Sequence, residues 1–260
     1  MASDPVAPLV AAAFFLLAAL AFARGWRSAA WLTAAGSVTL AAALAARGLR
    51  AGYWPLTGEY EFALVFALAI SLAALVLGRK QREGTGWVWA VAMLLATGLV
   101  VYARLILPEL ARAIRPLPPA LDSIWLPLHV STAALAYGAL AVAGTAGLIW
   151  LVRESDRTDA GRLLDQAIAA GYPLLTLALI FGMIWAQMAW GRYWGWDLKE
   201  VWTLITWLVY TLYWHLHRRP RWQGRRVAWL ALAGLASVLF TFLGVSWLAR
   251  TVGFESLHLF

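Results

Sequence analysis

The residues best suited to chemistry lie in one stretch, WGRYWGWDLKEVW at residues 190–202. It holds four of the 17 tryptophans together with three acidic or lysine side chains, Asp197 among them. A belt of tryptophans at a membrane interface would be the simpler explanation, but a belt requires neither an aspartate nor such close spacing. The spacing therefore favours a platform for a flat ligand, formed by Trp190, Trp194 and Trp196.

Histidine is the second signal, because the chain contains only four: His129, His215, His217 and His258. His129 and His258 flank the tryptophan-rich stretch in the sequence. Two neutral imidazoles can ligate haem iron from its two sides, and tryptophan faces accommodate a flat, apolar porphyrin. A lone histidine at a membrane surface is usually only solvated, so the prediction of a haem held between His129 and His258 depends on the combination.

His215 must belong to a different site. It follows Asp197 by eighteen residues, which is about 27 Å of helix. A histidine in a membrane-spanning helix is a candidate functional residue. Its neighbour His217 points about 200° around the helix, so the two cannot bind one iron from the same face. If His215 ligates haem, the site is either five-coordinate or completed by a histidine of another subunit.

The charged residues of the stretch allow two interpretations. Arg192 and Lys199 could neutralise haem propionates, because Arg and Lys are the usual partners of such carboxylates. They could equally pair with Asp197 and Glu200 and hold the loop. Asp197 directly precedes a helical segment, which favours a structural role as its N-cap.

Composition indicates a membrane protein. The 260 residues are 63% hydrophobic, compared with about 45–50% in a soluble domain. The chain contains no cysteine, which excludes disulfides, thiolate metal sites and cysteine nucleophiles. Asp4 stands where a signal peptide would carry positive charge, so we expect the first apolar segment to be retained.

The apolar runs predict an all-α, polytopic membrane protein with about eight transmembrane helices. The segments lie at about 6–23, 29–48, 61–78, 86–107, 127–151, 171–190, 198–216 and 228–249. Residues 1–120 would form helices 1–4, and residues 121–260 would form a core of helices 5–8 with their outer loops. The pattern near 158–168 predicts a separate amphipathic helix lying on the cytoplasmic interface.

Lysine and arginine counts predict the orientation. The first, third, fifth and seventh connections hold two, three, three and five of these residues, thirteen in all, and the other side of the membrane holds eight. Because cytoplasmic connections carry the excess of Lys and Arg, both termini and the tryptophan-rich stretch are expected on the extracytoplasmic side.

Residues 190–215, WGRYWGWDLKEVWTLITWLVYTLYWH, resemble the WWD signature of the haem-handling proteins of cytochrome c biogenesis. The WD-x-KE-x-W-x-LI-TW run and the expected eight spans are similar to the CcsA (ResC) branch of the system II pathway. Three further segments are similar to that branch, 128–138, 171–191 and 253–260. The resemblance covers about residues 125–260. Leu198 departs from it, because the family commonly has proline there.

The resemblance implies roles for the matching positions. His129 and His258 correspond to two external histidines that ligate haem iron, and His215 corresponds to a transmembrane histidine that binds haem during its passage. The platform corresponds to Trp190, Trp194, Trp196 and Asp197. The resemblance also implies a membrane partner, CcsB (ResB), that supplies the other transmembrane histidine.

Together these inferences predict a haem transporter that is a subunit of a system II cytochrome c synthase in the bacterial inner (plasma) membrane. Haem b, the transported substrate, is expected to reach the outer platform, where an apocytochrome c presents its CXXCH motif. Positioning and ligation of haem, rather than acid–base catalysis by side chains, would be the protein's contribution. No nucleic-acid partner is expected.

Three other functions remain open from the sequence. A CcmC-like carrier would present haem to a haem chaperone without synthase activity. A membrane cytochrome for electron transfer would hold haem between paired histidines on facing helices, an arrangement that four scattered histidines do not favour. A structural scaffold would use its tryptophans only as interfacial anchors.

Overall fold

The structure is a computed structural model that describes residues 6–80 and 84–252, and within those residues it is helical, with no strand. The long helices in this part of the chain are α1 (Ala7–Ala23), α2 (Ser28–Ala51), α3 (Glu59–Leu77), α4 (Gly86–Val101), α6 (Trp125–Val152), α7 (Arg157–Trp190), α8 (Leu198–Leu216) and α9 (Arg225–Leu239). One π-helical turn, Tyr102–Ile106, extends α4, and another, Phe240–Gly244, joins α9 to α10 (Val245–Val252). The short helix α5 (Glu109–Arg112) lies between α4 and α6.

The prediction of an all-α, polytopic membrane protein is confirmed. Among the described residues, six helices are long and apolar enough to span a membrane: α2, α3, α4 with its extension, α6, α7, and α9 with its extension. The apolar helix α1 is shorter, and α8 is not among the six. The number of eight spans, the orientation of the termini and the division at residue 120 stay predictions.

The amphipathic helix expected near residues 158–168 is not a separate element. Those residues form the first turns of α7, a continuous helix of 34 residues that carries Pro173 in its interior. At 1.5 Å per residue α7 is about 51 Å long, which exceeds the roughly 30 Å of a hydrocarbon core. The apolar face that includes Leu163, Leu164 and Ile168 is buried in the protein core, so it packs on neighbouring helices instead of lying on a membrane surface.

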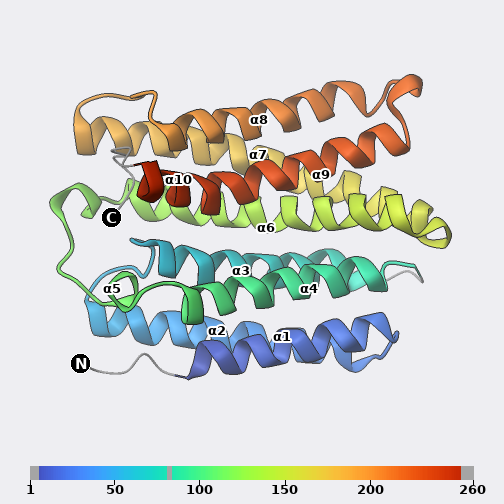
Figure 1. The fold of residues 1–260 in the computed structure, drawn as a ribbon, viewed down its shortest axis with the longest axis horizontal. Coiled ribbons are helices and arrows are strands. Elements are labelled where there is room, and N and C mark those ends of the chain that lie inside the picture. The colour runs from blue at the N-terminus through green and yellow to red at the C-terminus, as the bar shows by residue number, and fades with distance from the viewer. Residues whose placement is uncertain (1–5, 81–83, 253–260) are drawn as a thin grey trace.

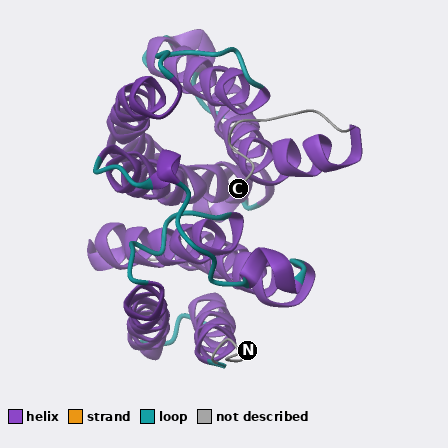
Figure 2. Ribbon diagram, turned by 90° about the vertical axis from the view of Figure 1, so that its left-hand side faces the viewer, coloured by secondary structure: helices purple, strands orange, loops and turns teal. Residues whose placement is uncertain are grey.

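The helices are roughly parallel or antiparallel to one another and form two groups, α1–α4 and α6–α9, one above the other in Figure 1. Figure 2 shows the same two groups from their ends. The groups meet where α3 and α4 pack against α6. A Cβ atom on Gly138 of α6 would lie 2.5 Å from the backbone carbonyl carbon of Ala69 on α3, so only glycine allows these two helices to approach so closely.

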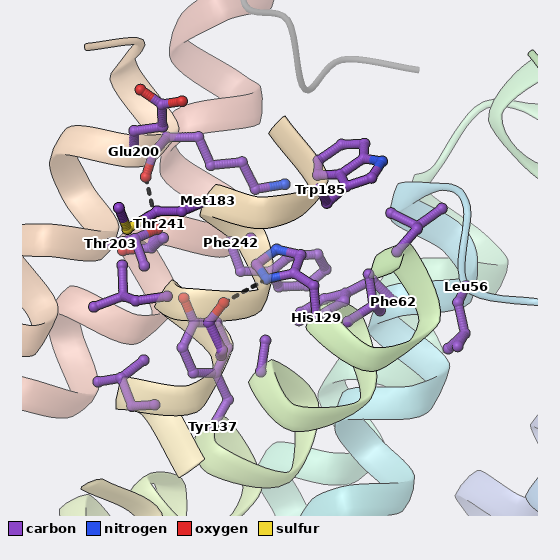
Figure 3. Close-up of a pocket in the computed structure, with 18 of the residues that line it drawn as sticks. Leu56, Phe62, His129, Tyr137, Met183, Trp185, Glu200, Thr203, Thr241 and Phe242 are labelled. Carbon is purple, nitrogen blue, oxygen red and sulfur yellow. Dashed lines mark hydrogen bonds between the residues drawn. The ribbon is translucent and has the colours of Figure 1, made fainter. Parts of the chain in front are cut away.

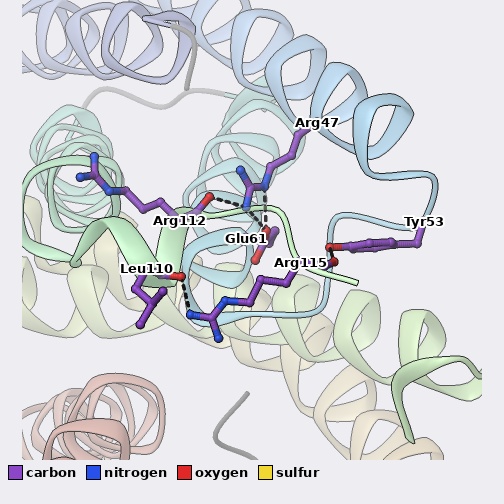
Figure 4. A network of polar contacts seen from close by, with 6 residues as sticks. All are labelled: Arg47, Tyr53, Glu61, Leu110, Arg112 and Arg115. Carbon is purple, nitrogen blue, oxygen red and sulfur yellow. Dashed lines mark hydrogen bonds and ion pairs between the residues drawn. The ribbon is translucent and has the colours of Figure 1, made fainter. Parts of the chain in front are cut away.

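A buried ion pair ties α2 to α3 near one end of the first group. Arg47 and Glu61 approach to 2.6 Å, and their side chains are only 5% and 7% exposed. The Arg47 guanidinium also donates to the carbonyl oxygen of Arg112 at 2.8 Å and lies 4.6 Å from the centre of the Tyr60 ring. Tyr53 in turn donates to the carbonyl oxygen of Arg115 at 2.8 Å. Figure 4 shows the ion pair and the hydrogen bonds of this set, which hold the connection after α4 against α2, α3 and the segment between them.

Candidate functional site

A cavity opens at the end of the molecule where α7 and α8 are joined. The space between atoms within it, with its open mouth and the adjoining solvent included, is about 1270 Å³. Its wall comes from α3, α6, α7 and α8, from the π-helical turn after α9, and from the residues that precede α3. Figure 3 shows His129, Tyr137, Trp185, Glu200 and Phe242 among the lining side chains.

His129 lies on α6 and is held from behind by α7. Its Nδ1 lies 2.8 Å from the carbonyl oxygen of Ala178. A carbonyl oxygen can only accept, so Nδ1 carries the proton, and the neutral ring then carries its lone pair on Nε2. A hydrogen bond of this kind, from one ring nitrogen to a carbonyl oxygen, orients histidines that bind metals.

The contact between His129 and α7 depends on a glycine. A Cβ atom on Gly182 would lie 2.8 Å from both Cε1 and Nδ1 of His129. The imidazole therefore occupies the space that any larger residue at position 182 would fill. The spacing of residues in the sequence carries no signal of this contact, because it joins two helices.

Trp185 forms the wall beside His129. The two rings are nearly parallel, at 14°, with centroids 6.1 Å apart. The Trp185 indole is 3% exposed and donates from Nε1 to the carbonyl oxygen of Ala120 at 2.9 Å. Trp190 packs against its edge with a centroid separation of 4.7 Å. Trp190 itself does not line the cavity, so it acts on the cavity wall only by packing against Trp185.

The aromatic loop, residues 191–197, links α7 to α8 and contributes Tyr193 and Trp194 to the cavity wall. Trp194 and Trp196 meet edge to face, at 82° and 5.8 Å, so they do not form one flat surface. Trp196 points away from the cavity and is 70% exposed. The Trp194 Nε1 atom is buried and has no hydrogen-bond partner in the described part of the chain.

The predicted N-cap is confirmed. The side chain of Asp197 accepts from the backbone N–H of Glu200, and the side chain of Glu200 accepts from the backbone N–H of Asp197. This reciprocal pair is a capping box, which satisfies donors that the first turn of a helix leaves unpaired. It starts α8 without the proline common in the family, and Asp197 itself does not line the cavity.

The two basic residues that the sequence could not separate have different surroundings. Lys199 lines the cavity. It makes no ion pair with any described residue, and the carboxylates whose charges act on it belong to Asp197 and Glu59. Arg192 is exposed, does not line the cavity, and lies against Gly195, where a Cβ atom would be 2.9 Å from its Nε.

Polar and apolar side chains are unevenly distributed in the lining, and the polar ones include Glu59 of α3 and His129 of α6. Lys199 and Thr203 of α8 and Thr241 of the π-helical turn bring polar groups, whereas α6 and α7 contribute mainly apolar side chains. An aromatic layer closes the inner side, where the rings of Phe62 and Phe242 are 5.0 Å apart. Tyr137 meets Phe62 edge to face at 6.1 Å. Aromatic pairs of this kind contribute favourable packing beyond their buried area.

The other histidines do not join His129 in the described structure. His215 lies near the far end of α8, where it is exposed and its Nδ1 is 2.8 Å from the carbonyl oxygen of Thr211. His217 is partly buried and stacks on Tyr213 at 5.4 Å and 7°. The prediction for His258 falls outside the described residues.

Of the residues predicted from the sequence, His129, Trp194 and Lys199 line the cavity, and Trp190, Arg192, Trp196 and Asp197 surround it. Several lining residues were not predicted from the sequence: Glu59, Phe62, Tyr137, Trp185, Glu200, Thr203, Thr241 and Phe242. Trp185 lies five residues before the tryptophan-rich stretch and could have been selected for that reason. The residues on α3 and after α9 carry no local signal.

Comparison with known proteins gives one consistent result. Residues 56–252 match the model of the family described as Cytochrome C assembly protein. A relative in Synechococcus elongatus named Cytochrome c biogenesis protein CcsA is 35% identical over 255 residues, covering 76% of this chain and 78% of its own length. Proteins of the same name in Guillardia theta and Gloeobacter violaceus are 32% and 31% identical, cover 76% of this chain, and match over 75% and 77% of their own lengths.

Proposed function

Because the chain belongs to the cytochrome c assembly protein family, in the CcsA branch of system II cytochrome c biogenesis, we propose that it carries haem b across the membrane and presents it to apocytochrome c. Membership places the protein in cytochrome c biogenesis. The finer role, a subunit of a cytochrome c synthase that attaches haem covalently, is part of the proposal, as are the bacterial plasma membrane and the extracytoplasmic position of the cavity.

The observation that carries this proposal is the setting of His129. Its Nδ1 is committed to the Ala178 carbonyl oxygen, so the neutral ring presents its Nε2 lone pair, which is the form that binds iron. Trp185 lies nearly parallel beside it. In the proposal, His129 and His258 ligate haem iron at the outer site, with Trp190, Trp194 and Trp196 and the capping residue Asp197 forming or supporting the surrounding platform.

The lining of the cavity also suits the polarity of haem. The apolar α6–α7 side matches the porphyrin, and the α8 side offers polar groups to its carboxylates. A buried indole N–H without an acceptor is unfavourable, and a ligand oxygen near Trp194 would remove that cost. Lys199 is the better propionate partner because it faces the cavity, whereas Arg192 lies outside it.

His215 would serve an inner site at the opposite end of α8. It follows the exposed Leu208 and Leu212 at helical spacing, so this face is open to lipid or to a partner helix. In the proposal, a CcsB (ResB)-like subunit packs on this face and supplies the second histidine ligand.

At the outer site the CXXCH motif of the apocytochrome provides the two thiols, since this chain has no cysteine. Each thiol adds across one vinyl group: a C–S bond forms, the C=C bond becomes single, and the thiol hydrogen moves to the neighbouring carbon. The addition needs no net oxidant. This chain's residues would bind and orient the substrate and exclude water.

The test is a visible spectrum with pyridine haemochrome quantification of the purified protein, alone and with its CcsB-like partner. Split α and β bands that weaken in His129→Ala and His258→Ala would support the outer site. Loss of a partner-dependent signal in His215→Ala would support the shared inner site. Lys199→Met should weaken haem retention about tenfold, the magnitude of one charge-assisted hydrogen bond, while Arg192→Ala should retain most of it.

Two outcomes would contradict the proposal. One is the absence of haem from every preparation, with cytochrome c maturation unaffected by the three histidine substitutions. The other is haem retention with no thioether formation when a CXXCH substrate and the partner are both supplied, because a carrier without synthase activity would behave in that way.

A further inference from the structure

We infer that Glu200 is the positioning residue of the aromatic loop: its carboxylate holds the loop so that Trp194 lines the cavity while Trp196 points outward. The hydrogen-bonding part of this inference stands on the structure alone. Its consequence for haem rests on the proposed function.

One oxygen of Glu200 gathers two backbone donors. Oε2 accepts from the N–H of Gly195 at 2.8 Å and from the N–H of Asp197 at 3.2 Å. The second contact belongs to the capping box, but the first reaches beyond it into the loop. Hydrogen bonds to a carboxylate are stronger than those between neutral groups, so the loop is fastened at two points, one on each side of Trp196.

Trp196 takes an unusual conformation between these two points. Its φ is +58°, and among the described residues it is the one that is not glycine and has positive φ. The left-handed conformation is unfavourable for an L-residue with a Cβ atom, and it persists only where the surroundings impose it. Side-chain packing alone does not impose it here, because the Trp196 indole is 70% exposed and touches Trp194 only edge to face. The paired bonds to Glu200 are the contacts that can.

The reversal at Trp196 sets the directions of its neighbours. Trp194 directly precedes Gly195, the first residue that Glu200 holds, and lies in the cavity wall. Trp196 follows and is turned outward, perpendicular to Trp194. Glu200 is on α8, the helix that also carries Lys199 and Thr203 into the cavity. Its carboxylate therefore couples the loop side of the cavity to the helical side.

Position 200 requires a side-chain oxygen that accepts hydrogen bonds more than it requires a negative charge. Glutamine at position 200 keeps a carbonyl oxygen at the same reach, which can accept both N–H groups. Alanine removes both bonds, so Trp196 can relax to negative φ. The comparison of Glu200→Gln with Glu200→Ala therefore separates positioning by hydrogen bonds from a purely electrostatic effect.

The experiment is limited trypsin digestion of the purified full chain in detergent, with cleavage after Arg192 followed by mass spectrometry. Cleavage between 217 and 226, at the opposite end of α8, serves as an internal reference. Relative to that reference, Glu200→Ala should be cut after Arg192 about tenfold faster than wild type, because local opening exposes the loop. Glu200→Gln should remain within about twofold of wild type. The split haem bands should weaken in Glu200→Ala and recover in Glu200→Gln.

A second variant controls for the loss of the helix cap. Asp197→Ala removes the side chain that accepts from the Glu200 N–H at 2.8 Å but leaves both bonds from the loop to Glu200 in place. If cap loss alone mattered, Asp197→Ala would be cut as fast as Glu200→Ala, and the inference would be overturned. Wild-type cleavage in Glu200→Ala, or equal damage in Glu200→Gln, would also overturn it.

One further result would contradict the proposed function but not the positioning role of Glu200. If Glu200→Ala loosens the loop and Glu200→Gln does not, while the haem spectrum is the same in all variants, Glu200 positions the loop as inferred. The loop would then have no part in holding haem.

Discussion

At the scale of single residues, the orientation of a candidate ligand depends on the residues that pack behind its side chain. His129 is oriented by a carbonyl oxygen on α7, and it reaches that oxygen only because position 182 lacks a side chain. A metal ligand held by such a contact keeps its tautomer and its direction before the ligand arrives.

We expect Gly182→Ala to weaken haem retention about tenfold, because the new Cβ atom would displace the imidazole and break its hydrogen bond. Haemochrome quantification measures this loss. The matched control is Gly98→Ala on α4, an exposed helical glycine whose Cβ atom would meet nothing within 4 Å. Equal haem content in the Gly98 and Gly182 variants would refute the role of the glycine.

At the scale of elements, buried polar contacts hold the helix ends together. The Arg47–Glu61 pair joins α2 to α3 and fixes the connection after α4 through the Arg112 carbonyl oxygen. Breaking a buried pair by removing one partner leaves the other charge uncompensated, which is more damaging than removing both.

Arg47→Met should therefore lower the free energy of unfolding by about 3–5 kcal/mol. The double variant Arg47→Met with Glu61→Leu should recover a large part of that loss, because no buried charge remains unpaired. Thermal unfolding in detergent compares the two with wild type. If the double variant is less stable than Arg47→Met alone, the ion pair stabilises the fold by more than the neutralisation of its two charges.

At the scale of the whole molecule, the turns fall into two sets. The ends of α1, α3, α6 and α8 lie at one end of the bundle, and the cavity, with the start of α8, lies at the other (Figure 1). Thirteen of the 21 lysines and arginines belong to the connections of the first set or to the first two turns of the helices that follow them. The positive-inside rule therefore predicts that this end is cytoplasmic and that the cavity faces outward.

Single-cysteine labelling tests this orientation against a background that contains no native cysteine. Ala113 directly follows α5, and Ser155 lies in the connection from α6 to α7 at the opposite end of the bundle (Figure 1). Both residues are exposed and small. A membrane-impermeant maleimide should label Ala113→Cys in intact cells and Ser155→Cys only after the membrane is opened. The reverse pattern would invert the topology and place the cavity on the cytoplasmic side.

The sequence alone determined the fold class and the starts of key elements. Long apolar runs specify membrane helices whatever their neighbours are, because an unpaired backbone is unfavourable in lipid. The N-cap at Asp197 was predictable for a related reason, since capping depends on residues only three positions apart. The prediction of a separate interfacial helix near residues 158–168 was wrong, because the apolar face of a helix does not reveal whether lipid or protein covers it.

Only the tertiary structure decided which residues share the cavity. His129 meets Gly182 across two helices, and Phe62 meets Phe242 from distant parts of the chain; no periodicity encodes such contacts. Lys199 and Arg192 looked equivalent in the sequence, yet one lines the cavity and the other lies outside it. Helix positions follow from local spacing, whereas the contents of a cavity follow from how separate helices pack.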